Sequence, residues 1–293
     1  MANLKAIRQR IKSVQNTKKI TSAMRLVAAA KVRRAQMRNS AARPFTSKVV
    51  QMLQQIVHEV SPIDLQDLPL LKKRPIKKVA LIIISSDRGL CGGYNGNVIK
   101  KAILRIQELM QEGKEVAVIP VGLKAASAFK RVKIEKIRNY TQLPAVPTVE
   151  EAKMIAENVC ELYVKKQIDA VEIIGTDFVN MIRQEVKIKN YFPITLPEGV
   201  DHFPKSAETL YEPTLMELME EELLPKYVEN VLYQALLEAS ASELAARMNA
   251  MSNATTNAKE LIDGLTLIYN KARQGNITQE LLEIVAGAEA LKG

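Results

Sequence analysis

The chain has 293 residues with 47% hydrophobic content, which is enough for one large or two small domains with a buried core. Its formal net charge is +10, and its two cysteines, Cys91 and Cys160, lack the paired spacing and neighbouring histidines of a zinc site, so no metal is expected. No apolar run approaches the roughly 20 residues that span a bilayer, and the N-terminus lacks the order of a signal peptide, so we expect a cytoplasmic location.

The first 60 residues are expected to form one long helix. They contain no glycine and a single proline, Pro44, in a background rich in Ala, Lys, Arg and Gln. Apolar residues recur with the three-and-four spacing of a coiled-coil seam. The expected seam comprises Leu4, Ile7, Ile11, Val14, Met24, Val27, Ala28, Val32 and Ala35. Pro44 should bend this helix, because proline removes one backbone hydrogen bond and crowds the preceding turn.

The positive excess of the chain is confined to this N-terminal segment. Residues 1 to 58 contain thirteen Lys or Arg side chains and no acid, which leaves 42 − 13 = 29 basic against 32 acidic residues in the remainder, or −3. Such a segment favours a negatively charged partner, which could be nucleic acid, an acidic membrane surface or acidic protein loops. A solvated charged face is the alternative, weakened by the complete absence of acids.

Residues 76 to about 195 change to an alternating pattern of strands and helices. The expected strands are 77–84, 115–122, 131–137, 168–180 and 185–191, and the expected helices are 95–113 and 148–167. Thr148 opens the second helix with Glu151 three residues later, as in a capping box. Strands that alternate with helices indicate a mostly parallel sheet. The pattern therefore predicts an α/β domain inserted between two halves of a coiled coil.

A glycine-rich stretch, "SSDRGLCGGYNGN" at 85–97, follows the first expected strand, where α/β proteins often bind phosphates or hold nucleophiles. Its glycines do not fit G-x-G-x-x-G, and no Lys-Ser or Lys-Thr completes a P-loop. Cys91 has no base nearby in sequence, since His58 and His202 lie in remote segments. We therefore favour a structural turn or a partner contact here. An α/β enzyme that uses Cys91 is the alternative.

The C-terminal 212–293 segment is expected to form a second long helix, with an interruption at Gly275. Between Ala239 and Ala258 its seam is mainly Ala, Ser and Met, and small residues let two backbones approach closely. The two terminal helices are therefore expected to pair in an antiparallel or crossed arrangement. The last turns carry the apolar residues Ile284, Val285 and Leu291, which need either a socket in a partner or a site on the chain's own domain.

Four stretches, at 7–31, 86–95, 246–258 and 269–288, closely resemble the gamma-subunit family of the F-type ATP synthases. They are "IRQRIKSVQNTKKITSAMRLVAAAK", "SDRGLCGGYN", "ARMNAMSNATTNA" and "YNKARQGNITQELLEIVAGA", so the resemblance covers nearly the whole chain. It implies a rotor shaft with no catalytic site and no cofactor of its own, present in one copy per complex. Residues 1–60 and 212–293 would form the antiparallel coiled coil, with a Rossmann-like α/β domain at 76–195.

The resemblance also implies partners and site residues. The coiled coil would turn inside the ring of alpha and beta subunits, with the α/β domain beside the epsilon subunit and the c-subunit ring, on the cytoplasmic face of a bacterial inner membrane. The implied residues are Met24, Arg25, Arg247, Gln274 and Thr278 for the beta subunits, Ile284, Val285 and Leu291 for the sleeve at the tip, and Asp87, Arg88, Cys91 and Tyr211 for the foot. A nucleic-acid-binding coiled coil is the rival, but no aromatic residue precedes Phe45 to stack on bases.

Overall fold

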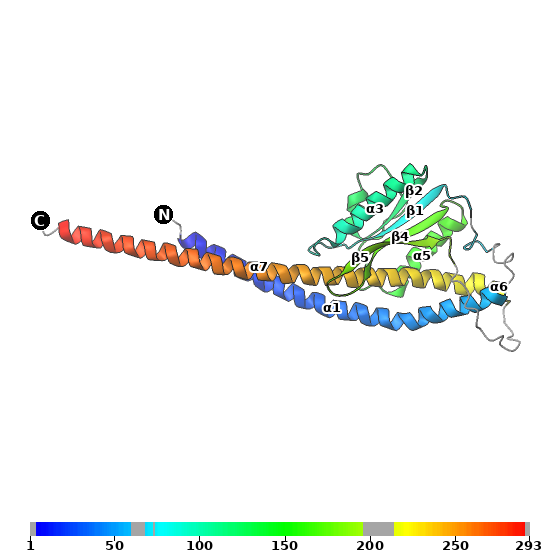
Figure 1. The fold of residues 1–293 in the computed structure, drawn as a ribbon, viewed down its shortest axis with the longest axis horizontal. Helices are drawn as coiled ribbons and strands as arrows, with labels where there is room; N and C mark the ends of the chain where they lie inside the picture. Colours follow the sequence, from blue (N-terminus) through cyan, green and yellow to red (C-terminus); the bar gives the residue numbers. More distant parts are fainter. Residues whose placement is uncertain (1–3, 60–67, 73, 196–213, 291–293) are drawn as a thin grey trace. The chain divides into compact units, whose positions relative to one another are not determined.

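Two long helices, α1 and α7, come from the two ends of the chain, and a five-stranded sheet lies between them in the sequence (Figure 1). The computed structural model describes residues 4–59, 68–72, 74–195 and 214–290. The chain divides into two units, residues 1–27 with 248–293, and residues 28–247. The elements are α1 (Leu4–Glu59), β1 (Lys78–Ile84), α3 (Tyr94–Gln111), β2 (Glu115–Val121), α4 (Leu123–Phe129), β3 (Glu135–Lys136), α5 (Val149–Val164), β4 (Ala170–Phe178), β5 (Gln184–Phe192), α6 (Leu215–Glu217), the π-helix η1 (Leu218–Leu223) and α7 (Leu224–Ala290).

The sheet has the strand order β3-β2-β1-β4-β5. All neighbouring pairs are parallel except β4 and β5, which are antiparallel. The central strand β1 pairs on both sides, so that Ile82 lies between Ile119 of β2 and Ile173 of β4. A strand in this position is buried on both faces and reads as a continuous apolar run, which explains "VALIII". The predicted α/β fold class, with a mostly parallel sheet, is confirmed.

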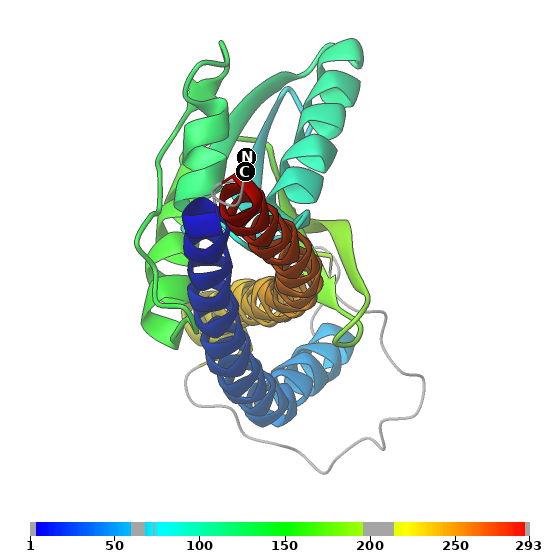
Figure 2. The ribbon, with the colours of Figure 1, turned by 90° about the vertical axis from the view of Figure 1, so that its left-hand side faces the viewer.

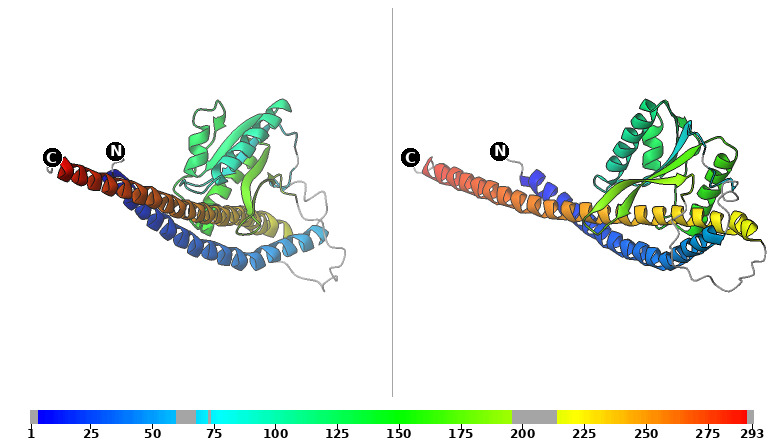
Figure 3. Two further views of the ribbon diagram at one scale, coloured as in Figure 1. Left: turned by 60° about the vertical axis from the view of Figure 1, so that its left-hand side comes forward. Right: turned by 45° about the vertical axis from the view of Figure 1, so that its right-hand side comes forward.

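Helices cover both faces of the sheet (Figure 3). Alternate residues of a strand point to opposite faces. In β1, Ala80, Ile82 and Ile84 face a core shared with α5 and α7. Val79, Leu81 and Ile83 of β1 face a second core, which is shared with α3. One helix-covered face of the sheet is therefore built around the first part of α7.

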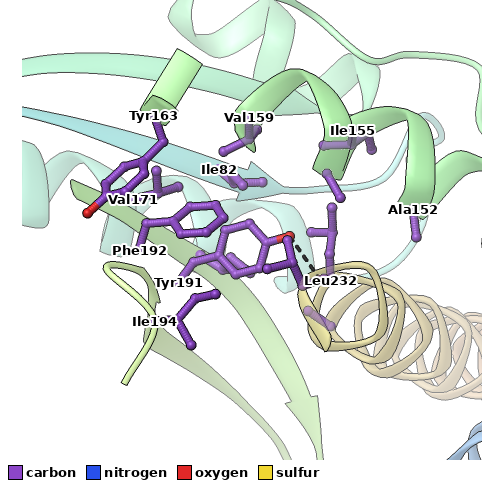
Figure 4. Close-up of a cluster of buried hydrophobic side chains, with 14 of the residues drawn as sticks. Ile82, Ala152, Ile155, Val159, Tyr163, Val171, Tyr191, Phe192, Ile194 and Leu232 are labelled. Atoms are coloured by element: carbon purple, nitrogen blue, oxygen red, sulfur yellow. Dashed lines mark hydrogen bonds between the residues drawn. The ribbon is translucent and has the colours of Figure 1, made fainter. Parts of the chain in front are cut away.

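Aromatic side chains at the end of β5 join the sheet to α5 and α7 (Figure 4). The ring of Phe192 stacks on Tyr163 of α5 with centroids 4.9 Å apart. The hydroxyl of Tyr191 donates to the Val228 backbone oxygen of α7 at 3.0 Å, which gives this buried polar group the partner it needs. Burial raises the pKa of Tyr191, so the hydroxyl keeps its proton and remains a donor. This contact fixes the start of α7 to the sheet.

The expected strand at 131–137 is wrong except for Glu135 and Lys136. The preceding residues turn out of α4 instead. The Val132 amide donates to the Phe129 oxygen at 3.2 Å, and the Ile134 amide donates to the Val132 oxygen at 2.9 Å. These local bonds remove both amides from pairing with β2. The predicted capping box at the start of α5 is confirmed, with the Thr148 amide donating to Glu151 Oε2 at 2.7 Å.

The two long helices are continuous. Pro44 lies inside α1, which continues to Glu59 and is curved in Figure 1. The interruption expected at Gly275 is wrong, because α7 runs unbroken from Leu224 to Ala290. A single glycine in a helix interior costs only about 1 kcal/mol relative to alanine, which a helix of this length tolerates.

Within each unit, α1 and α7 pair in opposite directions. In residues 28–247, Val32 and Ala35 of α1 are buried with Ala241, Leu244 and Ala245 of α7. In the other unit, the hydroxyls of Thr21 and Thr255 lie 2.8 Å apart. Figure 2 shows the start of α1 and the end of α7 at the same end of this unit.

The small-residue pairing predicted for 239–258 is thus confirmed where Ala241 and Ala245 meet α1. The predicted seam is wrong at Val27, whose side chain is 56% exposed. Ala28 of the predicted seam is buried, and so is Thr21, which the prediction left out. They are seven residues apart and therefore occupy equivalent positions of one heptad repeat.

Candidate functional site

The loop after β1 lies where the strand order of the sheet reverses, since β2 follows on one side of β1 and β4 lies on the other. In open α/β sheets, ligands bind in the crevice at this point. The Ser242 hydroxyl of α7 donates to the Thr176 backbone oxygen near the end of β4 at 3.2 Å. Phe178 and Met181 pack against the small residues of α7. The first part of α7 therefore packs beside the carboxyl end of β4.

A compact hydrogen-bond network holds the start of the loop. The Ser86 amide donates to Asn95 Oδ1 at 3.0 Å, and the Asn95 amide group donates to Cys91 Sγ at 3.1 Å. The Ser86 hydroxyl donates to the Arg88 backbone oxygen at 2.5 Å. Cys91 is buried, and Arg88 is exposed. The polar residues of the motif are thus used to shape the loop.

Asp87 and Gly122 connect the loop to α4. Asp87 Oδ1 accepts a hydrogen bond from the Leu123 amide at 2.7 Å, at the N-terminus of α4, where a carboxylate is favoured. Gly122 has φ +95°, and a Cβ atom there would lie 2.3 Å from the Ser85 backbone oxygen. This close approach lets the Ser85 hydroxyl accept from the Ala125 amide at 2.8 Å. Only glycine fits this position.

Arg247 of α7 reaches the tip of the loop. Its Nη2 donates to the Gly89 backbone oxygen at 3.2 Å, and its Nη1 pairs with Glu243 one turn earlier. The side chains of Arg247 and Glu243 are each 12% exposed. Burial raises the pKa of Glu243, and the negative charge of Asp87 raises it further, whereas Arg247 and Lys31 lower it. The tip of the loop is therefore attached to α7 by one exposed hydrogen bond from Arg247, whose guanidinium is held on α7 by the ion pair with Glu243.

Neither cysteine has the surroundings of a nucleophile. The described groups that contact Cys91 Sγ are the Ser86 hydroxyl, the Asn95 amide and the Arg88 backbone oxygen, and none of them is a base. The pKa of Cys160 is raised to about 12 by burial, with further contributions from Glu229 and Glu157. Cys160 lines a cavity of about 240 Å³ between α5 and the start of α7, which is smaller than most small-molecule sites.

The residues expected to contact partners lie on α1 and α7. Met24 and Arg25 are half-buried neighbours on α1. Gln274 and Thr278 are exposed on successive turns of α7, and the Thr278 hydroxyl donates to the Gln274 oxygen at 2.9 Å. Near the end of α7, Ile284 and Val285 are exposed by 68% and 61%. Tyr211 and Leu291 lie outside the described residues.

The basic residues of α1 are presented to solvent. Of the twelve whose side chains the structure describes, nine are exposed: Lys5, Arg8, Arg10, Lys12, Lys19, Arg33, Arg34, Arg38 and Lys48. In the part of the chain that the structure describes, no ion pair joins any of these nine to an acid. Arg38 donates to the Val146 backbone oxygen at 3.1 Å, and the nine together form an exposed helix surface of one sign.

The structure brings Arg247 together with the loop that contains Asp87 and Cys91. The family resemblance had implied a beta-subunit contact for Arg247 and a place at the foot for Asp87 and Cys91. Sequence reasoning missed the roles of Glu243, Leu90 and Gly122. Glu243 stands four residues before Arg247, which is the spacing of a helical ion pair and could have been noticed. The positive φ of Leu90, +65°, carries no sequence signal, because leucine rarely adopts it.

Two long helices from the ends of the chain, with an α/β domain inserted between them whose glycine-rich loop uses its polar groups within the chain, are typical of a structural subunit. No described helix has a stretch long and apolar enough to cross a bilayer. Residues 3–291 match the family model described as ATP synthase. The chain is 45% identical to the ATP synthase gamma chains of Thermosynechococcus vestitus and of Cyanothece sp., with 100% of both chains covered in each case. It therefore belongs to the ATP synthase gamma chain family, whose members are subunits of the complex and not its catalytic chains.

Solved structures agree with this assignment. The chain is similar to a chain in the central stalk and c-ring structure of the Tetrahymena thermophila mitochondrial ATP synthase, with a TM-score of 0.58, 27% identity, and coverage of 80% of this chain and 99% of that one. It shares its fold with a chain in the rotor of the Euglena gracilis mitochondrial enzyme, with a TM-score of 0.60 at 18% identity and coverage of 94% and 98%. The chain has the fold of a central-stalk subunit.

Proposed function

We propose that this chain is the central shaft of a proton-translocating ATP synthase, which couples rotation of the c-subunit ring to the conformational cycle of the beta subunits. The observation that carries the proposal is the unpartnered surface of its long helices, in a chain whose full length matches the gamma family. Exposed basic residues follow α1, and exposed apolar residues such as Leu281, Leu282 and Ile284 follow the end of α7. Surfaces of this kind mark contacts with other proteins.

The shaft would act by shifting populations and not by chemistry. Met24, Arg25, Gln274 and Thr278 are proposed to contact the beta subunits, and Ile284 and Val285 to turn in an apolar sleeve of the alpha and beta ring. A shaft without threefold symmetry makes different contacts with three chemically identical beta subunits. Each rotational step then changes which beta subunit favours the empty, ADP or ATP state, because a contact that differs between two conformations shifts the equilibrium between them.

We place the chain peripherally, on the cytoplasmic face of a bacterial inner membrane, with the α/β domain toward the epsilon subunit and the c ring. Arg88 is exposed at the loop after β1 and is available to such a partner. Asp87 and Cys91 are engaged within the chain, so we propose that they shape the loop and do not touch a partner directly. Arg247 is likewise engaged by Glu243 and Gly89, so we propose that it holds the loop and does not touch a beta subunit directly.

Co-assembly tests the proposal. The chain, co-expressed with alpha and beta subunits, should migrate with both on a native gel, and ATP hydrolysis should require the beta subunits. A variant with Leu281→Asp, Leu282→Asp and Ile284→Asp should lose the complex or weaken it, while Glu280→Asp serves as the control on the same turns. If the chain instead migrated with nucleic acid, in a complex whose affinity falls steeply as the salt concentration rises, the rotor proposal would be wrong. The basic helix would then be a nucleic-acid-binding surface.

A further inference from the structure

We infer that Arg247 is a positioning residue, which holds the tip of the β1–α3 loop, Gly89 and Leu90, against α7 so that the α/β domain turns with the helix pair. The attachment follows from the geometry alone. Its mechanical consequence rests on the proposed function of the chain as a rotor shaft.

The guanidinium group uses two of its nitrogens for two different elements. Nη1 pairs with Glu243 on α7, and Nη2 donates to the backbone oxygen of Gly89 in the loop. The planar fork of arginine suits this role, because one side chain can hold a carboxylate and a second acceptor in fixed directions. Glu243 also orients the guanidinium, since an ion pair at this spacing lies along one face of the helix.

The loop tip needs such a hold because its backbone is strained. Leu90 has φ +65°, a conformation that costs a residue with a Cβ free energy, and its side chain is 64% exposed. No burial of the Leu90 side chain offsets the strain. Strained residues persist only where the surroundings determine their conformation. The Gly89 oxygen immediately before Leu90 is the group that Arg247 holds.

The rest of the loop is already anchored inside the α/β domain. The Asn95 side chain bonds Ser86 and Cys91, and Asp87 caps α4. Burial and the nearby Glu243 raise the pKa of Tyr94, which follows the loop and keeps its proton. Arg247 is therefore the side chain that extends this rigid loop to α7. Torque applied to α7 would pass to the α/β domain through this point as well as through the apolar core.

The two cysteines of the chain allow a direct test in the full-length protein. Cys91 is buried in the loop and reports its opening, whereas Cys160 lies on α5 and serves as an internal reference. Modification of each by N-ethylmaleimide would be followed by mass spectrometry in Arg247→Gln, in Arg247→Lys and in Lys259→Gln, which removes one exposed charge from the same helix. We expect Cys91 to react about tenfold faster in Arg247→Gln, the factor that loss of one charge-assisted hydrogen bond gives in a local opening equilibrium. Lys259→Gln should match the native chain.

Arg247→Lys keeps the charge beside Glu243 but lacks the forked group, so it should also accelerate Cys91 while the thermal midpoint stays unchanged. An unchanged Cys91 rate in either Arg247 variant, or equal acceleration of Cys91 and Cys160, would overturn the attachment.

In the assembled complex both variants should hydrolyse ATP but pump fewer protons per ATP, with Arg247→Lys the milder of the two. Normal pumping alongside a fast Cys91 would overturn the mechanical role and leave the rotor assignment intact. If the native chain failed to assemble with the alpha and beta subunits, the proposed function would be wrong instead.

Discussion

The sheet and the outer part of α7 differ in where their stability comes from. Residues 79–84 of β1 are all buried, and the loop after β1 satisfies its polar groups within the chain. On α7 beyond residue 260, large apolar side chains are exposed instead, with Leu267 at 72%. The sheet and the first part of α7 form a core that is buried within the chain. The outer helix keeps large apolar side chains exposed in the described structure, so the two regions should respond very differently to substitution.

The largest effect on stability is expected at Gly122, where the structure leaves no space for a side chain. Gly122→Ala adds a Cβ atom 2.3 Å from the Ser85 oxygen at φ +95°. It should destabilise the fold by about 2 to 4 kcal/mol, since backbone strain and overpacking each cost about 1 to 3 kcal/mol. Gly113→Ala is the matched control, with φ +74° and open space around the site. Thermal unfolding of the purified chain compares them, and equal midpoints for the two would contradict the close approach.

A smaller loss is expected at the seam between the helices. Ala245 is fully buried in the cluster with Val32 and Ala35, whereas Ala29 is only half-buried on α1. Ala245→Leu should cost about 1 to 3 kcal/mol by overpacking, and Ala29→Leu clearly less. Urea denaturation monitored by circular dichroism measures both. If Ala29→Leu proved the more harmful, the pairing register described for residues 28–247 would be wrong.

A slight gain is expected on the outer helix. Gly264 lies inside α7 with open space around its Cα. Gly264→Ala should stabilise the chain by about 0.5 to 1 kcal/mol, because alanine loses less backbone entropy in a helix. Differential scanning calorimetry of the isolated chain can detect such a shift. A destabilised variant would mean that residue 264 is packed closely against another element.

No effect on catalysis is expected at Cys91. Its thiol contacts an amide, a hydroxyl and a backbone oxygen and no base, so Cys91→Ser should leave ATP hydrolysis by the reconstituted complex within about tenfold of normal, far less than the loss from removing a nucleophile. Native gels run in parallel would establish that assembly is unaffected. A larger loss in a fully assembled complex would mean that the loop takes part in chemistry.

Much of the architecture could be predicted from periodicity. The alternation of strands and helices and the long helix-forming ends specified an inserted α/β domain. The misses share a physical cause, which is competition from local bonds that have no periodic signature. Val132 and Ile134 alternate like strand residues but bond within a turn, and Gly275 is too weak a breaker to end a helix held by its neighbours.

The candidate site was less predictable, because its geometry depends on contacts between distant segments. Arg247 and Gly89 are 158 residues apart, and neither stretch contains a sequence pattern that predicts their hydrogen bond. The sequence predicted that the glycine-rich loop is not a phosphate-binding motif, because its glycines do not fit the known spacing, and this stays a prediction. The sequence could not show that α7 packs beside the end of β4 and bonds the tip of this loop. The partner contacts on α1 and the end of α7 stay predictions that rest on the family resemblance.

The central claim is that this chain works by contact along its exposed helices, and one comparison at Met24 tests it most directly. Met24 is a neutral residue among Lys18, Lys19, Arg25 and Lys31. Met24→Lys adds an attraction to an acidic partner loop, worth about 0 to 1 kcal/mol at an exposed contact, that must be broken at each rotational step. Protons pumped per ATP hydrolysed, measured in membrane vesicles, should fall in Met24→Lys while hydrolysis continues, and Met24→Leu should remain coupled. Equal ratios for the two variants would contradict the account and leave Met24 as ordinary helix packing.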